Sequence, residues 1–471
     1  MRGISKYKVI SRIGLMLVLA LTLHSCFVAK NYERPEFNST ENLYRTDMLP
    51  NDSISMASVP WETLFTDSYL KQYIAEGLEN NLDIRIAMQQ MIAAEAYMKQ
   101  GKAGYLPSLS AKATMTHQEL SKNSQFGSFF DGAIEQFETS ANLSWEADIW
   151  GKIRSNKRAT GANYLKTVAA HQAVKTRLIS TIASTYYRLL ALDAQLKVTR
   201  TSVKTRGNSV ETIKALKKAG QVTQVAVDRN IAQYNNAKAL QVDLETAIFK
   251  TENALSILLG KPAQTIARDS LSAQHIDTNI TAGVPAQLLA NRPDVKAAEF
   301  NLVQNFELTN VARANFYPSL TINATGGLQS LELDKLFDAN SLFANIVGGL
   351  TQPIFNQRRV KTQYEVAKAQ QEQALLNFKK TLLTAGNEVS NALYTYKAET
   401  EKYDYRNNEV VALRQAEKNS EALLENGFAN YLDVLTARQS ALNAELNVID
   451  SKLQQLLSAV TLYEALGGGV Q

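Results

Sequence analysis

The chain has 471 residues, of which 45% are hydrophobic and 20% are charged, so it can bury a large core and is not disordered by composition. Its formal net charge is +5, but Arg2, Lys6, Lys8 and Arg12 lie in the first 25 residues, which contain no Asp or Glu. Without these four charges the remainder carries only +1 (5 minus 4), and a nucleic-acid-binding protein is therefore not expected.

Residues 1–25 have the layout of a secretory signal peptide. A basic start precedes an apolar run from Ile13 to Leu23, and this run is too short for a membrane-spanning helix, which needs about 20 apolar residues. We therefore predict that the protein is exported from the cytoplasm.

Cys26, the only cysteine in the chain, directly follows this run in "LHSC". The small Ser25 before it and Leu23 three positions upstream resemble the bacterial lipobox, where the signal is removed and the cysteine is lipidated. His24 departs from the small residue usual at its position, and Phe27 is not the Asp that marks retention in the inner membrane. We expect a covalent lipid on Cys26 and the outer membrane as location; the alternative is an ordinary signal peptide with a stray or buried thiol.

Residues 26–60 are predicted to form an extended, lipid-anchored tether, because residues 27–60 contain three prolines, many polar residues and no sustained period. Beyond it, two stretches without proline permit very long helices: 154 residues between Pro107 and Pro262, and 118 residues after Pro353. Apolar residues recur every seven positions in both, as in a coiled coil. A helix near residues 153–218 would have ~65 residues and be roughly 100 Å long, which suits a structure that crosses the periplasm.

Each long helix is predicted to turn and return as a second helix, because Gly220 and Gly427 interrupt the two patterns and glycine is common just past a helix end. The two halves also align with each other. "NLDIRIAMQQMIAAEA" from Asn81 matches "RPDVKAAEFNLVQNFE" from Arg292 at an offset of 211. We therefore divide the chain into a first repeat (61–265, tip near 220), a linker (266–284), a second repeat (285–466, tip near 428) and a C-terminal tail (467–471).

Four strands are expected, at about 106–118, 136–149, 317–329 and 342–354, two in each repeat. In the first, the alternation places Leu109, Ala111, Ala113 and Met115 on one face and Ser110, Lys112, Thr114 and Thr116 on the other. The fourth alternates less cleanly and is assigned mainly by its place in the repeat.

Strands of about ten residues with one apolar and one polar face are typical of transmembrane β-barrels. Four strands cannot close a barrel, and a lipid-exposed edge is not tolerated, so several chains must share one barrel: twelve strands in a trimer, or eight in a dimer. The polar face would line a water-filled lumen. The alternative is a soluble protein with two surface hairpins packed on a helical core.

The order of these segments resembles the TolC-like family of outer-membrane factors, and most closely its lipidated OprM/NodT-like branch, from about Val59 to Leu466. "PWETLFTDSYLKQYIAEGLENNLDIRIA" resembles the family's opening segment, and "GVPAQLLANRPDVKAAEFNL" its most recognisable one. The specific part of the latter is Arg292, Pro293 and Asp294, which suits a helix start because proline is favoured in the first turn and a carboxylate complements the helix dipole.

The resemblance implies a mainly α-helical homotrimer with membrane β-structure: a twelve-stranded β-barrel in the outer membrane that continues into a twelve-helix α-barrel in the periplasm. It also implies two protein partners, a periplasmic adaptor and an inner-membrane transporter of the resistance-nodulation-division (RND) class that supplies the energy. The chain itself would be a passive exit duct for drugs or other toxic compounds.

No catalytic chemistry is suggested: we find no catalytic residues, no metal-ligand spacing among the histidines, no nucleotide-binding loop and no cofactor motif. A duct should be closed at its periplasmic tip. From the resemblance we expect gate residues at Tyr431, Leu432 and Asp433, where an apolar ring resists wetting and a carboxylate ring attracts cations. Thr436 stands where a second acidic residue is expected, and packing within the hairpin is the alternative role of Tyr431 and Leu432.

The adaptor is expected to contact the two tips. These contacts are assigned to Gly220, Gln221, Val222 and Thr223 and to Gly427, Phe428, Ala429 and Asn430. Two other functions remain open: a TolC-like portal for type I protein secretion, and a structural coiled-coil lipoprotein without a pore.

Overall fold

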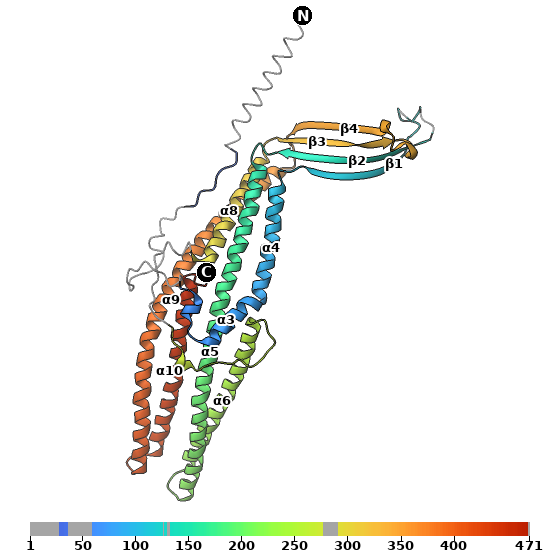
Figure 1. The fold of residues 1–471 in the computed structure, drawn as a ribbon. Coiled ribbons are helices and arrows are strands. Elements are labelled where there is room, and N and C mark those ends of the chain that lie inside the picture. The colour runs from blue at the N-terminus through green and yellow to red at the C-terminus, as the bar shows by residue number, and fades with distance from the viewer. Residues whose placement is uncertain (1–27, 36–58, 126, 130–131, 277–290, 470–471) are drawn as a thin grey trace. The chain divides into compact units, whose positions relative to one another are not determined.

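The computed structural model describes residues 28–35, 59–125, 127–129, 132–276 and 291–469 (Figure 1). The predicted signal peptide and Cys26 lie outside the described residues, as do residues 36–58 of the tether and residues 277–290, which comprise the end of the linker and the start of the second repeat. Among the described helices, none combines the length and the apolarity that a membrane-spanning helix requires.

The order of helices and strands occurs twice along the chain. After the short α2 (Trp61–Leu64) and α3 (Ser68–Asn80), the first series is α4 (Leu82–Ala103), β1 (Ser108–Glu119), β2 (Ala133–Ala147), α5 (Lys152–Lys218) and α6 (Gln224–Leu258). After the 3₁₀ turn η4 (Leu271–Ala273), the second series is α8 (Pro293–Ala314), β3 (Ser319–Ser330), β4 (Leu342–Thr351), α9 (Arg359–Glu425) and α10 (Tyr431–Ala465), with the 3₁₀ turns η5 (Leu333–Lys335) and η6 (Ala339–Ser341) between the strands. Corresponding helices of the two series have equal lengths: α4 and α8 have 22 residues each, α5 and α9 have 67, and α6 and α10 have 35.

Local capping explains where several helices begin. The side chain of Asp67 accepts a hydrogen bond from the backbone of Leu70 at the start of α3. Asn81 accepts from the backbone nitrogens of Asp83 and Ile84 at the start of α4, at 2.9 and 3.2 Å. These side chains satisfy N–H groups that have no partner in the first turn of a helix.

The four strands form one antiparallel sheet in the order β1-β2-β3-β4 (Figure 1). Each strand pairs with its neighbour over ten or more residues, and β2 pairs with β3 although α5 and α6 lie between them in the sequence. The strand pairs of the two repeats therefore join in a single sheet, of which β1 and β4 are the edges.

The chain packs as two compact units, and each takes residues from both repeats. The first unit contains the sheet and takes in the described residues within 28–35, 92–166 and 298–378. The second unit contains both hairpin tips and takes in the described residues within 59–91, 167–297 and 379–469. The units thus do not coincide with the two sequence repeats.

The second unit has a hydrophobic core rich in aromatic side chains, in which Phe65, Tyr186, Tyr187 and Tyr463 are all at most 1% exposed. The hydroxyl of Tyr186 donates to Asp67 at 2.8 Å, so this buried polar group is satisfied. Burial is the main cause that raises the pKa of Tyr186, and the neighbouring Asp67 raises it further.

Candidate functional site

The register of the sheet separates apolar from polar side chains across β1 and β2. Leu109 lies opposite Leu143, Ala111 opposite Ala141 and Met115 opposite Phe137, and opposite residues of a ladder share a face. The pair between them on this face is Ala113 with Thr139, whose hydroxyl is the exception to the apolar pattern. The intervening pairs are polar: Ser110 with Asn142, Lys112 with Ser140 and Thr114 with Glu138.

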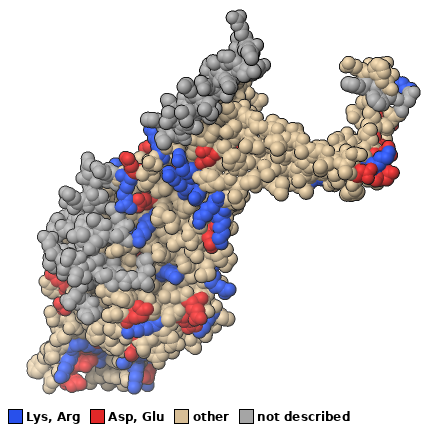
Figure 2. Space-filling view, turned by 45° about the horizontal axis from the view of Figure 1, so that its top comes forward, with Lys and Arg blue, Asp and Glu red and all other residues tan. Residues whose placement is uncertain are grey.

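The apolar face continues across β3 and β4. Ala324 and Ile322 lie opposite Leu143 and Trp145 of β2, and Ile346 lies opposite Ala324. In β4 the residues on this face are Leu342, Ala344, Ile346, Gly348 and Leu350. The opposite face of β4 also carries two apolar residues, Phe343 and Val347, so this strand alternates less cleanly than β1. Figure 2 shows a broad stretch of the sheet surface without charged side chains.

An aromatic cluster lies where the strands meet the helices. Trp150 stacks on Tyr317 with ring centroids 4.8 Å apart, and its indole nitrogen donates to the backbone oxygen of Pro318 at 2.7 Å. The indole nitrogen of Trp145 donates to the backbone oxygen of Tyr105 at 2.9 Å. Aromatic residues of this kind form the girdles of membrane barrels, where a ring contacts lipid and a polar atom is satisfied. Sequence reasoning missed this cluster, although the aromatic residues in "YLPSL" and "FYPSL" are a signal for it.

The described part of the tether, residues 28–35, binds along α8 in the first unit. The side chain of Asn310 pairs with the backbone of Lys30 in both directions, at 3.2 and 2.9 Å. Nearer Cys26, Arg313 donates to the backbone oxygen of Val28 at 3.2 Å. Farther along, Arg34 forms a forked ion pair with Glu299. This segment is therefore fixed by specific polar contacts.

Both hairpin tips have the same backbone construction. Gly220 and Gly427 take φ values of +76° and +79°, a conformation that side chains other than glycine rarely adopt. The residue after each glycine donates to a carbonyl five positions earlier, from Gln221 to Leu216 and from Phe428 to Leu423, which completes a Schellman motif.

The return helices begin with Thr223 and Asn430 as N-caps. In the second tip the cap is a capping box: Asn430 accepts from the backbone of Asp433 at 3.1 Å, and the Asp433 carboxylate accepts from the backbone of Asn430 at 3.0 Å. Asp433 therefore has a local structural role beside the gate role expected from the sequence. Leu432 is 48% exposed.

Tyr431 joins the two hairpins. Its hydroxyl donates to the side-chain oxygen of Asn230 on α6 at 2.6 Å, and Asn230 is only 3% exposed. The structure thus connects one predicted gate residue to the first hairpin. Within the described residues, no hydrogen bond joins Leu432 or Asp433 to that hairpin.

Two arginines make further bonds between the hairpins. Arg206 of α5, 7% exposed, donates to Gln233 of α6 at 2.6 Å and to Gln439 of α10 at 2.8 Å. Arg438 of α10 donates to Ser209 of α5 at 2.5 Å. Burial is the main cause that lowers the pKa of Arg206, followed by the nearby Arg438. Sequence reasoning missed both arginines, because nothing in their spacing indicates a partner more than 200 residues away.

Arg292 of the family motif connects three elements of the second unit. It donates to Asp294 in its own motif at 3.0 and 2.7 Å, pairs with Glu388 of α9 at 2.7 Å, and donates to the backbone oxygen of Ala465 at the end of α10 at 2.9 Å. Burial alone would lower the pKa of Arg292, but the two carboxylates raise it overall. Pro293 is the first residue of α8, as expected of a helix start.

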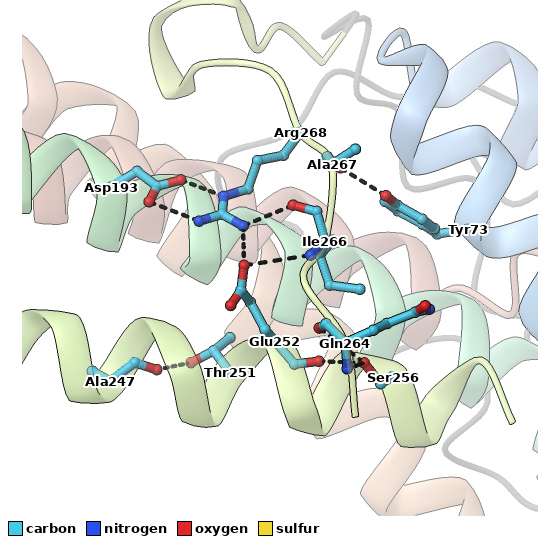
Figure 3. Close-up of polar contacts among 10 residues, drawn as sticks. All are labelled: Tyr73, Asp193, Ala247, Thr251, Glu252, Ser256, Gln264, Ile266, Ala267 and Arg268. Carbon is cyan, nitrogen blue, oxygen red and sulfur yellow. Dashed lines mark hydrogen bonds and ion pairs between the residues drawn. The ribbon is translucent and has the colours of Figure 1, made fainter. Parts of the chain in front are cut away.

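The half-buried Arg268 fixes the segment that follows α6 (Figure 3). Arg268 forms a bidentate ion pair with Asp193 of α5 and donates to Glu252 of α6 at 2.5 Å and to the backbone oxygen of Ile266 at 2.8 Å. Hydrogen bonding to Asp193 is the main cause that raises the pKa of Arg268, and burial opposes it. Arg268 lies beside a cavity of about 890 Å³ that is also lined by Lys197, Tyr403 and Lys452.

Within the described part of the chain, no group of three or more His, Cys, Asp or Glu side chains is arranged to hold a metal ion. Lys and Arg are interspersed with Asp and Glu on the face seen in Figure 2, and no broad area of that face carries a single sign. The candidate functional features are therefore the two-faced sheet, the tether bound along α8 and the two hydrogen-bonded hairpins.

Comparison with known proteins agrees with this arrangement. The family model described as "Outer membrane efflux protein" matches residues 73–261 and 284–468. The cation efflux system protein CusC of Escherichia coli O157:H7 is 27% identical, over 96% of this chain and 98% of that protein. The outer membrane protein OprJ of Pseudomonas aeruginosa is 28% identical, over 96% of this chain and 95% of that protein.

Solved structures show the same fold. The open state of the MtrE outer membrane channel of Neisseria gonorrhoeae matches with a TM-score of 0.83 and 26% identity, covering 94% of this chain and 98% of that one. A structure of CusC matches with a TM-score of 0.81 and 25% identity, covering 94% and 99%. The chain therefore belongs to the outer membrane efflux protein family.

Proposed function

We propose that the chain is the outer-membrane exit duct of a tripartite efflux system and conducts small toxic compounds passively as a homotrimer. The observation that carries the proposal is the sheet, which has one mainly apolar face across all four strands and two edges, β1 and β4, without a further strand among the described residues. The family is one of efflux proteins, and this agrees with the expectation that the chain is not an enzyme.

Closure of the barrel requires other copies of the chain. An open edge exposes backbone N–H and C=O groups that lipid cannot satisfy, so β1 of one copy must pair with β4 of the next. Three copies give twelve strands, and the polar residues of each sheet then face a shared aqueous lumen. The long helix pairs would continue the duct as a twelve-helix barrel in the periplasm.

The partners and the cargo follow from the relatives. Their names include cation efflux, toluene efflux and solvent efflux proteins, so the family serves chemically different compounds. We propose that an inner-membrane transporter of the RND class selects the compounds and a periplasmic adaptor connects it to the hairpin tips.

The lipid anchor is proposed at Cys26. It precedes Val28 by two residues, so the two Cα atoms can be at most about 8 Å apart. Val28 is bound by Arg313, which lies six positions before the first residue of β3 and close in sequence to the aromatic cluster at Tyr317. A lipid at Cys26 would thus enter the membrane beside the strand bases. Mass spectrometry of the mature N-terminus tests this, and an unmodified cysteine would contradict it.

The gate is proposed at the hairpin tips, with Tyr431, Leu432 and Asp433 as its residues. The bonds from Tyr431 to Asn230, from Arg206 to Gln439 and from Arg438 to Ser209 support a closed arrangement, because each must break if the hairpins separate. Opening is then a population shift, in which the adaptor binds the open arrangement more tightly than the closed one.

Labelling of single cysteines tests the orientation of the sheet. Cells that express Lys112→Cys or Thr114→Cys should react with a membrane-impermeant maleimide, because these positions face water in the proposed barrel. Ala111→Cys and Ala113→Cys should not react, because they face lipid. The background is low, since Cys26 is the only native cysteine and its thiol would carry the proposed lipid. Equal labelling at the four positions would contradict the two-faced wall.

Deletion and reconstitution test the function itself. Loss of the gene should increase susceptibility to compounds exported by the partner pump, and trimers in planar bilayers should conduct ions. Stable trimers that never conduct, together with unchanged susceptibility of the deletion strain, would instead support a structural lipoprotein.

A further inference from the structure

We propose that the two hairpin tips bind different surfaces of the adaptor. The first tip binds an acidic surface, and the second binds a basic surface with an apolar pocket. This inference rests on the proposed function, in which the tips receive the adaptor. It goes beyond that function by assigning opposite chemistry to two tips of the same backbone construction.

The tips differ in charge although their turns are equivalent. Within nine residues of Gly220, four cations stand against two carboxylates, a net charge of +2: Lys214, Lys217, Lys218 and Arg229 against Glu211 and Asp228. Within nine residues of Gly427, one cation stands against three carboxylates, a net charge of −2: Lys418 against Glu421, Glu425 and Asp433. The difference is four charges per chain.

Helix electrostatics explains the cations of the first tip but not the carboxylates of the second. The C-terminus of a helix carries partial negative charge, so Lys217 and Lys218 in the last turn of α5 are favourable there. The last turn of α9 contains no basic residue and ends at Glu425, whose carboxylate is placed against the same partial charge. Glu425 therefore does not stabilise the helix that carries it.

Contacts within the chain leave Glu425 available. Glu421 pairs with Arg438 at 2.6 Å, and Asp433 is held in the capping box. Glu425 is exposed, and no ion pair engages it among the described residues. In the first tip Lys214 pairs with Glu211 at 2.9 Å, whereas Lys218 is exposed and has no ion pair in the described part of the chain. The carboxylate of Glu425 and the ammonium group of Lys218 thus remain available to a partner, each two positions before the glycine of its tip.

The apolar content of the tips differs as well. Phe428, directly after Gly427, is 82% exposed. The equivalent residue after Gly220 is the polar Gln221. An exposed aromatic ring beside a carboxylate fits a pocket flanked by Lys or Arg, because aromatic side chains are the usual anchors of protein interfaces and the charge sets the orientation. The first tip offers charge without such an anchor.

Charge reversal tests the assignment with the full-length trimer in nanodiscs. The probe is the purified adaptor whose deletion reproduces the susceptibility of the strain that lacks this chain. Glu425→Lys and Lys218→Glu should each weaken its binding about tenfold at low salt, with a smaller effect at high salt. The affinity of Glu425→Gln for the adaptor should lie between those of the native trimer and of Glu425→Lys. The matched control is Glu372→Lys, the same exchange at an exposed site of α9, 53 positions before Glu425 and so about 80 Å along the helix.

The outcomes separate this inference from the proposed function. If the native trimer binds the adaptor, and Glu425→Lys and Lys218→Glu both bind it as tightly as Glu372→Lys does, the adaptor does not recognise the tip charges and the inference is wrong. If only one of the two charge reversals weakens binding, the inference that each tip binds its own adaptor surface is also wrong. If no adaptor binds the native trimer, and no adaptor deletion reproduces its phenotype, the proposed function fails.

Discussion

Replacement of Arg268 by alanine is expected to lower the free energy of unfolding by about 3 kcal/mol, because it leaves Glu252 and Asp193 without their cation. Glu252 is only 8% exposed, so water cannot fully replace the lost partner. Lysine should restore stability only in part, since one ammonium group cannot reproduce the fork that binds Asp193 through two nitrogens.

The measurement is guanidinium denaturation followed by the helical circular dichroism signal. The matched control is Arg200→Ala on the same helix as Asp193, where Arg200 pairs with Glu245 and both side chains are largely solvent-accessible, at 59% and 41%. Exposed pairs contribute about 0–1 kcal/mol, so this variant should denature nearly as the native protein does. If the two alanine variants were equally stable, Arg268 would not fix the segment after α6.

Tyr431→Phe is expected to open the duct in the absence of an adaptor. The exchange removes only the hydroxyl that donates to Asn230 and leaves a buried acceptor without its donor. Loss of one such bond costs about 1 kcal/mol in the closed arrangement. If the three copies open together, the sum of about 3 kcal/mol corresponds to a more than 100-fold larger open-to-closed ratio.

Single-channel recording in planar bilayers measures this ratio, and sensitivity to a bulky antibiotic reports the same opening in cells. Tyr405→Phe is the matched control: Tyr405 is 66% exposed, and its hydroxyl donates to Glu401 within α9 rather than between hairpins. Open times that are unchanged in Tyr431→Phe, or equally increased in both variants, would show that the Tyr431 bond does not hold the gate.

Much of the fold could be predicted because its signals are local. The proline-free stretches and the seven-residue spacing predict long helices, and Gly220 and Gly427 mark the turns at which φ is positive. The alternation from Leu109 to Met115 predicts a two-faced strand, and the register agrees with that pattern. The family resemblance is confirmed by the matching family model and by the relatives.

The candidate site was predicted less completely. Tyr431 was expected at the gate from the resemblance, but its bond to Asn230 joins residues 201 positions apart. Arg206 and Arg438 carried no sequence signal at all, since an arginine on a helix is usually a solvated residue. Asp433 was expected to face the lumen as a charge, and its place in a capping box became visible only with the backbone geometry at Asn430.

The sequence by itself determined the elements, their order and their internal repeat, because helix and strand periods are properties of neighbouring residues. Only the tertiary structure decided which distant side chains meet: Arg292 with Glu388, Arg268 with Asp193, and Asn310 with the tether at Lys30. The physical reason is that hydrogen bonds and ion pairs act over about 3 Å. Their partners therefore depend on how long helices pack, which no local pattern specifies.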